Sequence, residues 1–312
     1  MKNKKIAIGM DIGGGHIKCA GVDLSDNTFI RESIAEAPVD NQAAADVILD
    51  VWSSTIGQCI QSIGLENLEG IGFGMPGPFD YVKGIALFEK VLKYESLYGI
   101  NVAEKIREKL DLPADMPVMF NNDATAFALG EDWVGKGADY QRVVALTLGS
   151  GFGSAFIDGG IPVVTGDRVP EIGAMWHLPF KDGIANDYIS TNWFIDEYER
   201  ISGKKMPGVK EIAELYDAEE EVRKLFDVYG RSMGQIIAPW LKSFNAEIVI
   251  PGGNITRAFH LYSDSLYDEL GPELKDVKIE ISELKEDGAL LGSARLVDVD
   301  YYDIVFPTLK YM

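Results

Sequence analysis

The stretch that decides the fold is "IAIGMDIGGGHIKCAGVD", residues 6–23. An apolar run ends at Asp11, three glycines follow at positions 13–15, and a second run begins after them. A dinucleotide-binding fingerprint has a strand, spaced glycines and then a helix. The residues after Gly15 instead alternate with a period of about two, which predicts a second strand. The stretch therefore predicts a strand–turn–strand hairpin, whose turn is either an anion-binding nest or an ordinary tight turn.

The same arrangement occurs a second time, in "RVVALTLGSGFGSAFIDGGI" at 142–161. The two stretches indicate a weak internal repeat. Helical spacing over 43–64, 99–112 and most of 193–245, between strand-like segments, is typical of α/β proteins. Near the end of the chain, 287–297 has the small residues of a closely packed helix. The sequence therefore predicts two similar α/β halves, each with one glycine-rich turn.

Composition limits the partners and the compartment. The chain has 312 residues and a formal net charge of −20, which opposes binding to nucleic acids and to anionic membranes. No apolar stretch is long enough to span a membrane, and the first apolar run is too short for a signal peptide. Its two cysteines, Cys19 and Cys59, suggest no disulfide framework. We therefore expect a cytoplasmic protein that binds neither nucleic acid nor membrane.

Four motifs occur in a fixed order: "GMDIGGG", "FNNDATAFALGEDW", "LTLGSGFGSAFIDGG" and "IVIPGGN". Together with "GIGFGMPGPFD" at 70–80, this order resembles the ROK family of sugar kinases in the actin/hexokinase/Hsp70 superfamily. The resemblance extends from Ile6 to the terminal "GALLGSARL". It implies two actin-like, ribonuclease H-like α/β domains with a cleft between them. The implied N-terminal domain covers 1–121 and is completed by a C-terminal helix at 288–303, and the implied C-terminal domain covers 122–287.

The activity that the resemblance implies is that of an ATP-dependent, glucokinase-like hexose kinase. Because similar proteins are often dimers, a homodimer is expected. Such an enzyme transfers the γ-phosphoryl group to a sugar hydroxyl, here expected to be the 6-OH of glucose or a related hexose. Glycine-rich turns suit this chemistry because they present backbone N–H groups to phosphates. Asp11 is expected to hold Mg²⁺ through water, since Mg²⁺ keeps much of its hydration. The residues implied for ATP and its phosphates are Asp11, Gly13, Gly14, Gly15, Thr147, Gly149, Ser150, Gly151, Gly153, Gly252 and Gly253.

Asp123 has two compatible interpretations. It follows a strand-like segment and precedes "ATAFALGE", so it is placed to cap a helix. The resemblance implies that it is the general base that accepts the proton of the attacking sugar hydroxyl. The sugar-binding residues implied with it are Gly77, Asn122, Asp123, Glu171, His177 and Asp187.

The segment "VPEIGAMWHLPFKDGIANDYIS" departs from the family pattern, which has G-E-x-G-H followed by zinc-binding cysteines. Matching "EIG" makes Glu171 the sugar-binding acid and leaves Ala174 in the histidine position. Matching "GAMWH" keeps His177 but places Ala174 where the glutamate is usual. The second alignment shortens the loop that carries the zinc cysteines, so no structural zinc is expected. It also places Asn186 or Asp187 where a further sugar-binding acid is usual.

The sequence is also compatible with two other functions. The same family contains sugar-responsive transcriptional regulators, but the acidic charge and the lack of a DNA-binding segment before the first strand argue against one. A degenerate kinase that senses a sugar or nucleotide is also compatible with Ala174. In the first turn, Gly15 and His16 replace the family's usual Thr and Lys, and these departures bear on the identity of the sugar and not on the nucleotide fold. His177 is alternatively a core histidine bonded to backbone.

Overall fold

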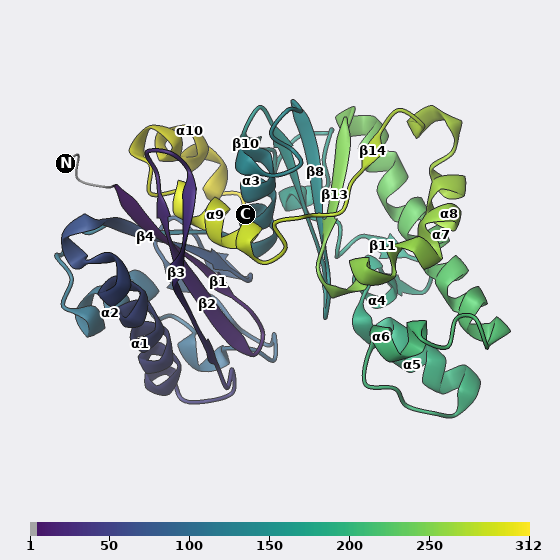
Figure 1. The fold of residues 1–312 in the computed structure, drawn as a ribbon, viewed down its shortest axis with the longest axis horizontal. Coiled ribbons are helices and arrows are strands. Elements are labelled where there is room, and N and C mark those ends of the chain that lie inside the picture. Colours follow the sequence, from purple (N-terminus) through teal and green to yellow (C-terminus); the bar gives the residue numbers. More distant parts are fainter. Residues whose placement is uncertain (1–4) are drawn as a thin grey trace. The chain divides into compact units, whose positions relative to one another are not determined.

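The computed structural model describes residues 5–312, and its elements are labelled in Figure 1. The chain divides into two compact units. The first extends to Gly135 and resumes at Glu286–Met312, and the second is Lys136–Lys285. The first unit thus includes the helix that follows Asn122, although this helix was expected in a domain covering 122–287.

The first unit is built on a five-stranded sheet in the order β3-β2-β1-β4-β7. β1 and β2 are antiparallel, as are β2 and β3, whereas β4 is parallel to β1 and β7 is parallel to β4. The strands of this unit are β1 (Ile6–Ile12), β2 (His16–Asp23), β3 (Thr28–Pro38), β4 (Leu68–Met75), β5 (Phe79–Asp80), β6 (Ile85–Ala86) and β7 (Val118–Asn122). Its α-helices are α1 (Ala45–Ile63), α2 (Val102–Leu110), α3 (Asp123–Val134), α9 (Asp287–Arg295) and α10 (Val299–Leu309), with 3₁₀ turns at Leu65–Asn67 and Glu95–Leu97.

The β1–β2 hairpin confirms the strand–turn–strand prediction, with Ile12 paired to Ile17 at its end. Alternation along β1 separates two layers. Ile8 and Met10 are fully buried in one apolar cluster with Trp52 of α1. Gly9 faces α9 on the opposite side of the sheet, where an added Cβ atom would lie 1.8 Å from the Leu290 carbonyl oxygen.

Glycines also let α9 approach other elements of the first unit. A Cβ atom on Gly72 of β4 would lie 1.8 Å from the Ser293 carbonyl oxygen, and one on Gly130 of α3 would lie 1.9 Å from that of Gly288. No side chain fits at such distances, so these glycines are required for packing. The small-residue helix predicted near the end of the chain is therefore confirmed.

The expected single C-terminal helix over 288–303 is wrong in one respect. The structure has two helices there, α9 and α10, separated at residues 296–298. Asp298 starts the second one, because its carboxylate accepts a hydrogen bond from the Tyr301 amide at 3.1 Å. An N-cap of this kind satisfies an amide that has no partner within the helix.

The second unit repeats the topology of the first, with a sheet in the order β10-β9-β8-β13-β14. Antiparallel β8 and β9 correspond to β1 and β2, and β13 is parallel to β8 as β4 is to β1. The internal repeat predicted from the two glycine-rich stretches is thus confirmed. The strands are β8 (Arg142–Leu148), β9 (Phe152–Asp158), β10 (Ile161–Pro162), β11 (Pro179–Phe180), β12 (Gly183–Ile184), β13 (Ile248–Gly252) and β14 (Lys278–Ile279).

Helices fill the rest of the second unit, as the pattern over 193–245 predicts. They are α4 (Ala185–Tyr188), α5 (Thr191–Ser202), α6 (Val209–Ala213), α7 (Glu220–Phe244) and α8 (Phe259–Leu270), with 3₁₀ turns at Glu171–Gly173, Asn254–Ala258 and Pro272–Leu274. Aromatic side chains form much of its core, including Phe194, Phe226 and Tyr229. Within residues 5–312, no helix combines the length and the apolar character that crossing a membrane requires. Cys19 and Cys59 are buried and unpaired by disulfide.

Candidate active site

The turn between β1 and β2 exposes backbone. Gly14 and Gly15 are exposed, and a Cβ atom on Gly15 would meet no other atom within 4 Å. The φ angles of Gly13, Gly14 and Gly15 lie outside the left-handed region, so the turn itself does not require glycine at these positions. At Gly14 and Gly15 the missing side chains instead leave the main chain accessible, which favours the anion-binding interpretation of this turn over the ordinary tight turn.

Carboxylates gather beside this turn. Asp11 is half-buried, and its pKa is raised to about 7 by burial and then by the negative charges of Asp123 and Glu286, with Lys18 acting in the opposite direction. Lys18 is the direct cross-strand partner of Asp11 in the β1–β2 ladder. A raised pKa of this origin means that a further cation would be favourable near Asp11.

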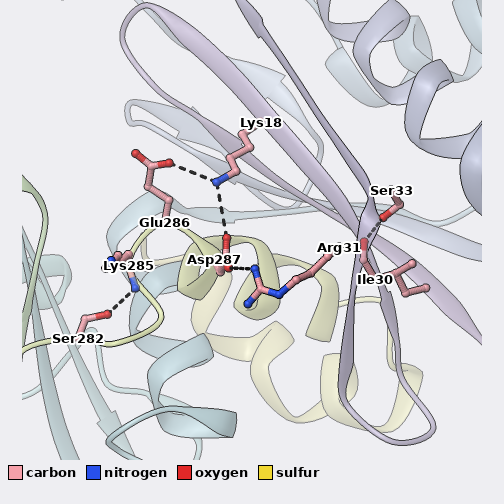
Figure 2. Close-up of polar contacts among 8 residues, drawn as sticks. All are labelled: Lys18, Ile30, Arg31, Ser33, Ser282, Lys285, Glu286 and Asp287. Carbon is pink, nitrogen blue, oxygen red and sulfur yellow. Dashed lines mark hydrogen bonds and ion pairs between the residues drawn. The ribbon is translucent and has the colours of Figure 1, made fainter.

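Lys18 forms ion pairs with carboxylates at the start of α9 (Figure 2). Its ammonium lies 3.3 Å from a carboxylate oxygen of Glu286 and 3.5 Å from one of Asp287. Arg31 of β3 contacts the other oxygen of Asp287 at 3.5 Å. These pairs attach the first turn of α9 to β2 and β3, and they complete the charged surroundings of Asp11.

The N-cap of α3 is Asn122, the residue before Asp123. The Asn122 side-chain oxygen accepts hydrogen bonds from the Ala124 and Thr125 amides at 3.1 and 3.3 Å. Asp123 is the first residue of α3, and one of its oxygens accepts from the Ala124 amide at 2.9 Å. The prediction that Asp123 is the N-cap is therefore wrong, because Asn122 occupies the extended position before the helix.

Asp123 is half-buried, and burial raises its pKa above the usual value for an aspartate. Hydrogen bonds from the Ala124 amide and the charge of Lys93 act in the opposite direction. A carboxylate whose pKa is raised is a better proton acceptor when ionised, which suits a general base.

Tyr81 extends this group of side chains and was missed at the sequence level. Its hydroxyl donates to the Met75 carbonyl at 3.1 Å and accepts from the Asn122 amide group at 3.4 Å. A Cβ atom on Gly77 would lie 3.5 Å from the same hydroxyl oxygen. The structure therefore brings Gly77, Tyr81, Asn122 and Asp123 together in the first unit. No local pattern marks Tyr81, because its contacts are made by residues up to 41 positions away.

The turn between β8 and β9 in the second unit corresponds to the β1–β2 turn of the first unit. Leu148 pairs with Phe152 at its end, and the Asn186 side chain accepts a hydrogen bond from the Phe152 amide at 2.9 Å. A Cβ atom on Gly149 would meet nothing within 4 Å, and one on Gly151 would lie 3.2 Å from the Asn186 oxygen. This turn too has glycines whose absent side chains leave backbone accessible.

Thr147, Ser150 and Gly153 belong to the same turn and its flanks. Thr147 and Gly153 are directly paired across β8 and β9, and both are half-buried, whereas Ser150 is exposed at the tip. Gly252, at the end of β13, pairs with Thr147 on the other side of β8. The structure thus places these predicted phosphate residues together, where β8 and β13 end and β9 begins.

Gly253 differs from the phosphate-turn glycines. Its φ of 95° is in the left-handed region, and a Cβ atom there would lie 2.3 Å from the Leu148 carbonyl oxygen. Backbone conformation and packing both require glycine at this position. Its role in the fold is to let the β13 turn lie against the end of β8.

A cavity of about 870 Å³ lies in the second unit beside these turns. Thr191, which lines it, donates its amide to the Gly149 carbonyl at 2.8 Å, and Asn254 of the β13 turn also lines it. Other lining residues include Lys210, Tyr216 and Arg257. The volume is within the usual range for small-molecule sites. The contribution of α6 was not predicted from the local sequence pattern.

The residues of the segment that departs from the family pattern differ in their exposure. Glu171 is exposed in a 3₁₀ turn. His177 is half-buried, and among residues 5–312 its buried Nδ1 atom has no hydrogen-bond partner. A core histidine bonded to backbone through Nδ1 is therefore not what the described residues show. An orphaned buried polar atom is costly unless something else bonds to it.

Asp187 is exposed, and its carboxylate accepts a hydrogen bond from the Ile184 amide at 2.9 Å. Of the two residues considered for a sugar-binding acid, Asn186 is the one that contacts the phosphate turn. Within the described part of the chain, no three His, Cys, Asp or Glu side chains are arranged to hold a metal ion. An ion carried by a nucleotide phosphate needs fewer protein ligands.

The sequence profile of the ROK family matches residues 7–299. The chain belongs to the ROK family. A glucokinase from Thermotoga maritima is 25% identical over 90% of this chain and 97% of its own length. An N-acetyl-D-glucosamine kinase from Escherichia coli O157:H7 is 27% identical over 92% of this chain and 98% of its own length.

Solved ROK structures share the fold. A ROK hexokinase from Thermus thermophilus has a TM-score of 0.78 at 18% identity, covering 96% of this chain and 99% of its own. A ROK family glucokinase from Streptomyces griseus, in complex with glucose and AMPPNP, has a TM-score of 0.73 at 21% identity, covering 93% and 98%. A ROK family transcriptional regulator, a homologue of the E. coli MLC protein, has a TM-score of 0.77 at 19% identity, covering 98% and 81%. The expected actin-like, two-domain α/β fold is confirmed.

Proposed function

We propose that this protein is an ATP-dependent hexose kinase, with Asp123 as the general base. The observation that carries the proposal is the start of α3. Asn122 caps the helix, so the half-buried carboxylate of Asp123 is not needed as the cap. An accessible glycine turn lies in the same unit. Membership of the ROK family and the kinase activities in the names of its relatives support this assignment.

The proposed reaction depends on positioning and charge. Asp123 accepts the proton of the attacking hydroxyl, and Gly77, Asn122 and the Tyr81 hydroxyl orient the sugar around it. An amide side chain offers both a donor and an acceptor to a polyol. Phosphoryl transfer needs little further covalent chemistry from the protein, because alignment and neutralisation of charge lower most of the barrier.

ATP is proposed to bind through both glycine-rich turns. Backbone amides at Gly14, Gly15, Ser150 and Gly151 would donate to phosphate oxygens, with Thr147 and Ser150 adding hydroxyl donors. The amides of Gly13 and Gly149 instead close the turns, because they donate to the carbonyls of His16 and Gly151 at 3.0 and 3.1 Å. Asp11, whose negative neighbours favour a cation, would hold a magnesium ion through water. When bound, Mg²⁺ neutralises phosphate charge. The cavity that starts at Thr191 and Asn254 is proposed to take the nucleoside.

The sugar is proposed to be a hexose phosphorylated at its 6-OH. Glucose is the first candidate and N-acetylglucosamine the second, since the two relatives described above carry those names. The buried Nδ1 atom of His177 supports a sugar contact at that residue. Glu171 and Asp187 also stay proposed sugar contacts, although both are exposed in the structure. The homodimer and the cytoplasmic location remain predictions.

A sensor or regulator without kinase activity is the second candidate, because a ROK transcriptional regulator has the same fold. Release of ADP, measured with a panel of hexoses and N-acetylhexosamines, separates the two. We expect saturable ADP release with at least one hexose and a sugar 6-phosphate as product. Binding of sugar or ATP without turnover over the whole panel would contradict the kinase and support the sensor.

A further inference from the structure

The loop 90–94 has an unusual backbone. Lys90, Leu92 and Tyr94 have φ angles of 60°, 59° and 56°. Left-handed conformations are uncommon for residues other than glycine, and each costs free energy that other contacts must offset. Three such residues within five positions therefore require other contacts that hold the loop in this conformation.

The contacts of the loop lead to the first glycine turn. The Tyr94 hydroxyl donates to the Gly13 carbonyl at 2.6 Å, and the Tyr94 amide donates to the Asn41 carbonyl at 2.8 Å. Asn41 in turn donates its side-chain amide to the Gly14 carbonyl. The Tyr94 ring is fully buried and makes an edge contact with Trp52 at 5.5 Å between centroids. The loop is thus fixed against the turn by buried packing and by hydrogen bonds.

Lys93 is held between these strained residues, and its side chain lies over the turn. The ammonium nitrogen is 3.6 Å from the point where a Cβ atom of Gly14 would lie. Lys93 also influences Asp123: burial, the largest effect, raises the pKa of that carboxyl, and the charge of Lys93 lowers it. One ammonium group therefore lies next to the accessible backbone of the turn and within electrostatic range of the proposed base.

Lys93 contrasts with Lys18, the other lysine near this site. Lys18 forms ion pairs with Glu286 and Asp287 (Figure 2). Its side chain is 14% exposed. Lys93 is exposed, and it makes no ion pair with any residue from 5 to 312. Its ammonium nitrogen instead lies beside the glycine turn, near Gly14. Such an arrangement leaves its charge available to an anion on the turn.

We propose that Lys93 is a further catalytic residue, whose ammonium group contacts the phosphoryl group during its transfer to the sugar. This role rests on the proposed kinase function. In the reaction the bond from the sugar oxygen to the γ-phosphorus forms, and the bond from that phosphorus to the bridging oxygen of ADP breaks. The hydroxyl proton goes to Asp123, and ADP leaves with the electron pair. Lys93 exchanges no proton, and its positive charge stabilises the phosphoryl oxygens as charge shifts among them.

Two substitutions on the same loop test this role. Lys93→Met removes the charge and keeps most of the side-chain length, and Lys90→Met removes a charge three residues away as the matched control. We expect Lys93→Met to lower kcat on the order of 10²-fold, with Lys90→Met close to the unaltered protein. Lys93→Arg should retain much of the activity because the charge remains. Melting temperatures of all three variants establish that they are folded.

A binding measurement gives a readout that does not depend on turnover. Calorimetric titration with AMPPNP should show about 10-fold weaker affinity for Lys93→Met than for Lys90→Met, with a smaller loss for ADP, which lacks the γ-phosphate. Unchanged kcat and unchanged AMPPNP affinity in folded Lys93→Met would overturn the role of Lys93 and leave the kinase proposal standing.

Failure of the kinase proposal is distinguishable from that result. If the unaltered protein binds AMPPNP but phosphorylates no sugar, the kinase proposal fails, and weaker AMPPNP binding by Lys93→Met still supports the phosphate contact. An unaltered protein that binds no nucleotide would contradict both.

Discussion

The two glycine turns are the same hairpin with different chemistry around them. Asp11 and Thr147 occupy equivalent positions, each one residue before the last paired residue of its strand, and their cross-strand partners are Lys18 and Gly153. A charged pair in the first unit therefore corresponds to a hydroxyl and a glycine in the second. Under the proposed function, the first turn would serve charge control and reaction chemistry, and the second would supply neutral hydrogen bonds to phosphate.

The largest effect is expected at Asp123, the proposed base in the first unit. Asp123→Asn keeps size and most hydrogen bonding but cannot accept the hydroxyl proton, so turnover should fall on the order of 10²–10⁴-fold. ATP affinity and melting temperature should change little, because Asn122 remains the helix cap. Turnover, calorimetry and thermal unfolding of the same preparation measure all three. Near-normal turnover would remove Asp123 from the mechanism and favour a sensor.

Blocking the turns tests whether both bind phosphate. Gly14→Val and Gly151→Val should each weaken ATP binding by about 10-fold or more, with a smaller effect on sugar binding, because a side chain would obstruct the approach of phosphate to the backbone. At Gly14 an added Cβ atom would be 3.6 Å from Lys93 Nζ, an ordinary contact. At Gly151 it would be 3.2 Å from Asn186 Oδ1, so the Asn186 side chain must shift by a few tenths of an ångström. A folded variant with unchanged ATP affinity would reduce that turn to a structural role.

The charge of the first turn should be visible in the stability of the ligand-free protein. The pKa of Asp11 is raised from 3.8 to about 7, so the folded state holds its proton between those pH values and loses stability as pH rises toward 7. Asp11→Asn removes that loss. We expect its free energy of unfolding to exceed that of the unaltered protein by roughly 1–3 kcal/mol at pH 8, allowing for partial exposure, and by little at pH 4.

Denaturant unfolding at the two pH values measures this difference, with Asp115→Asn as a control that changes an exposed carboxylate in the same unit. A difference between Asp11→Asn and the unaltered protein that does not depend on pH would show that the fold does not raise the pKa of Asp11.

The smallest effect is expected at the equivalent position of the second turn. Thr147→Val replaces a hydroxyl by a methyl group of similar size, so ATP affinity should fall only about 2- to 10-fold, as for loss of one neutral hydrogen bond. Stability should show no dependence on pH beyond that of the unaltered protein. A loss as large as that of Asp123→Asn would contradict the division of roles between the two turns.

Local pattern was sufficient for the hairpins, because alternation with period two and runs of glycine lie within a few residues of one another. It also located the helix at Asp123, but not the cap, since Asn122 and Asp123 are both good capping residues and only the backbone angles decide between them. Local pattern did not predict Tyr81 and Lys93 as site residues, because their neighbours in space, Asn122 and Gly14, are distant in sequence. The membership of α3 in the first unit depends on its packing with α9, which no local pattern encodes.

The close packing of α9 on the first sheet has a consequence for synthesis on the ribosome. The second unit is continuous in sequence, so all of it has been translated when residue 285 is added. The first unit, although its strands are made earliest, lacks α9 until residues 286–295 emerge, and the glycine face around Gly9 and Gly72 stays uncovered until then. At 5–20 residues per second, roughly 8–30 s separate the end of the first segment from the arrival of α9. The unit that comes second in the sequence is therefore the first that can finish folding.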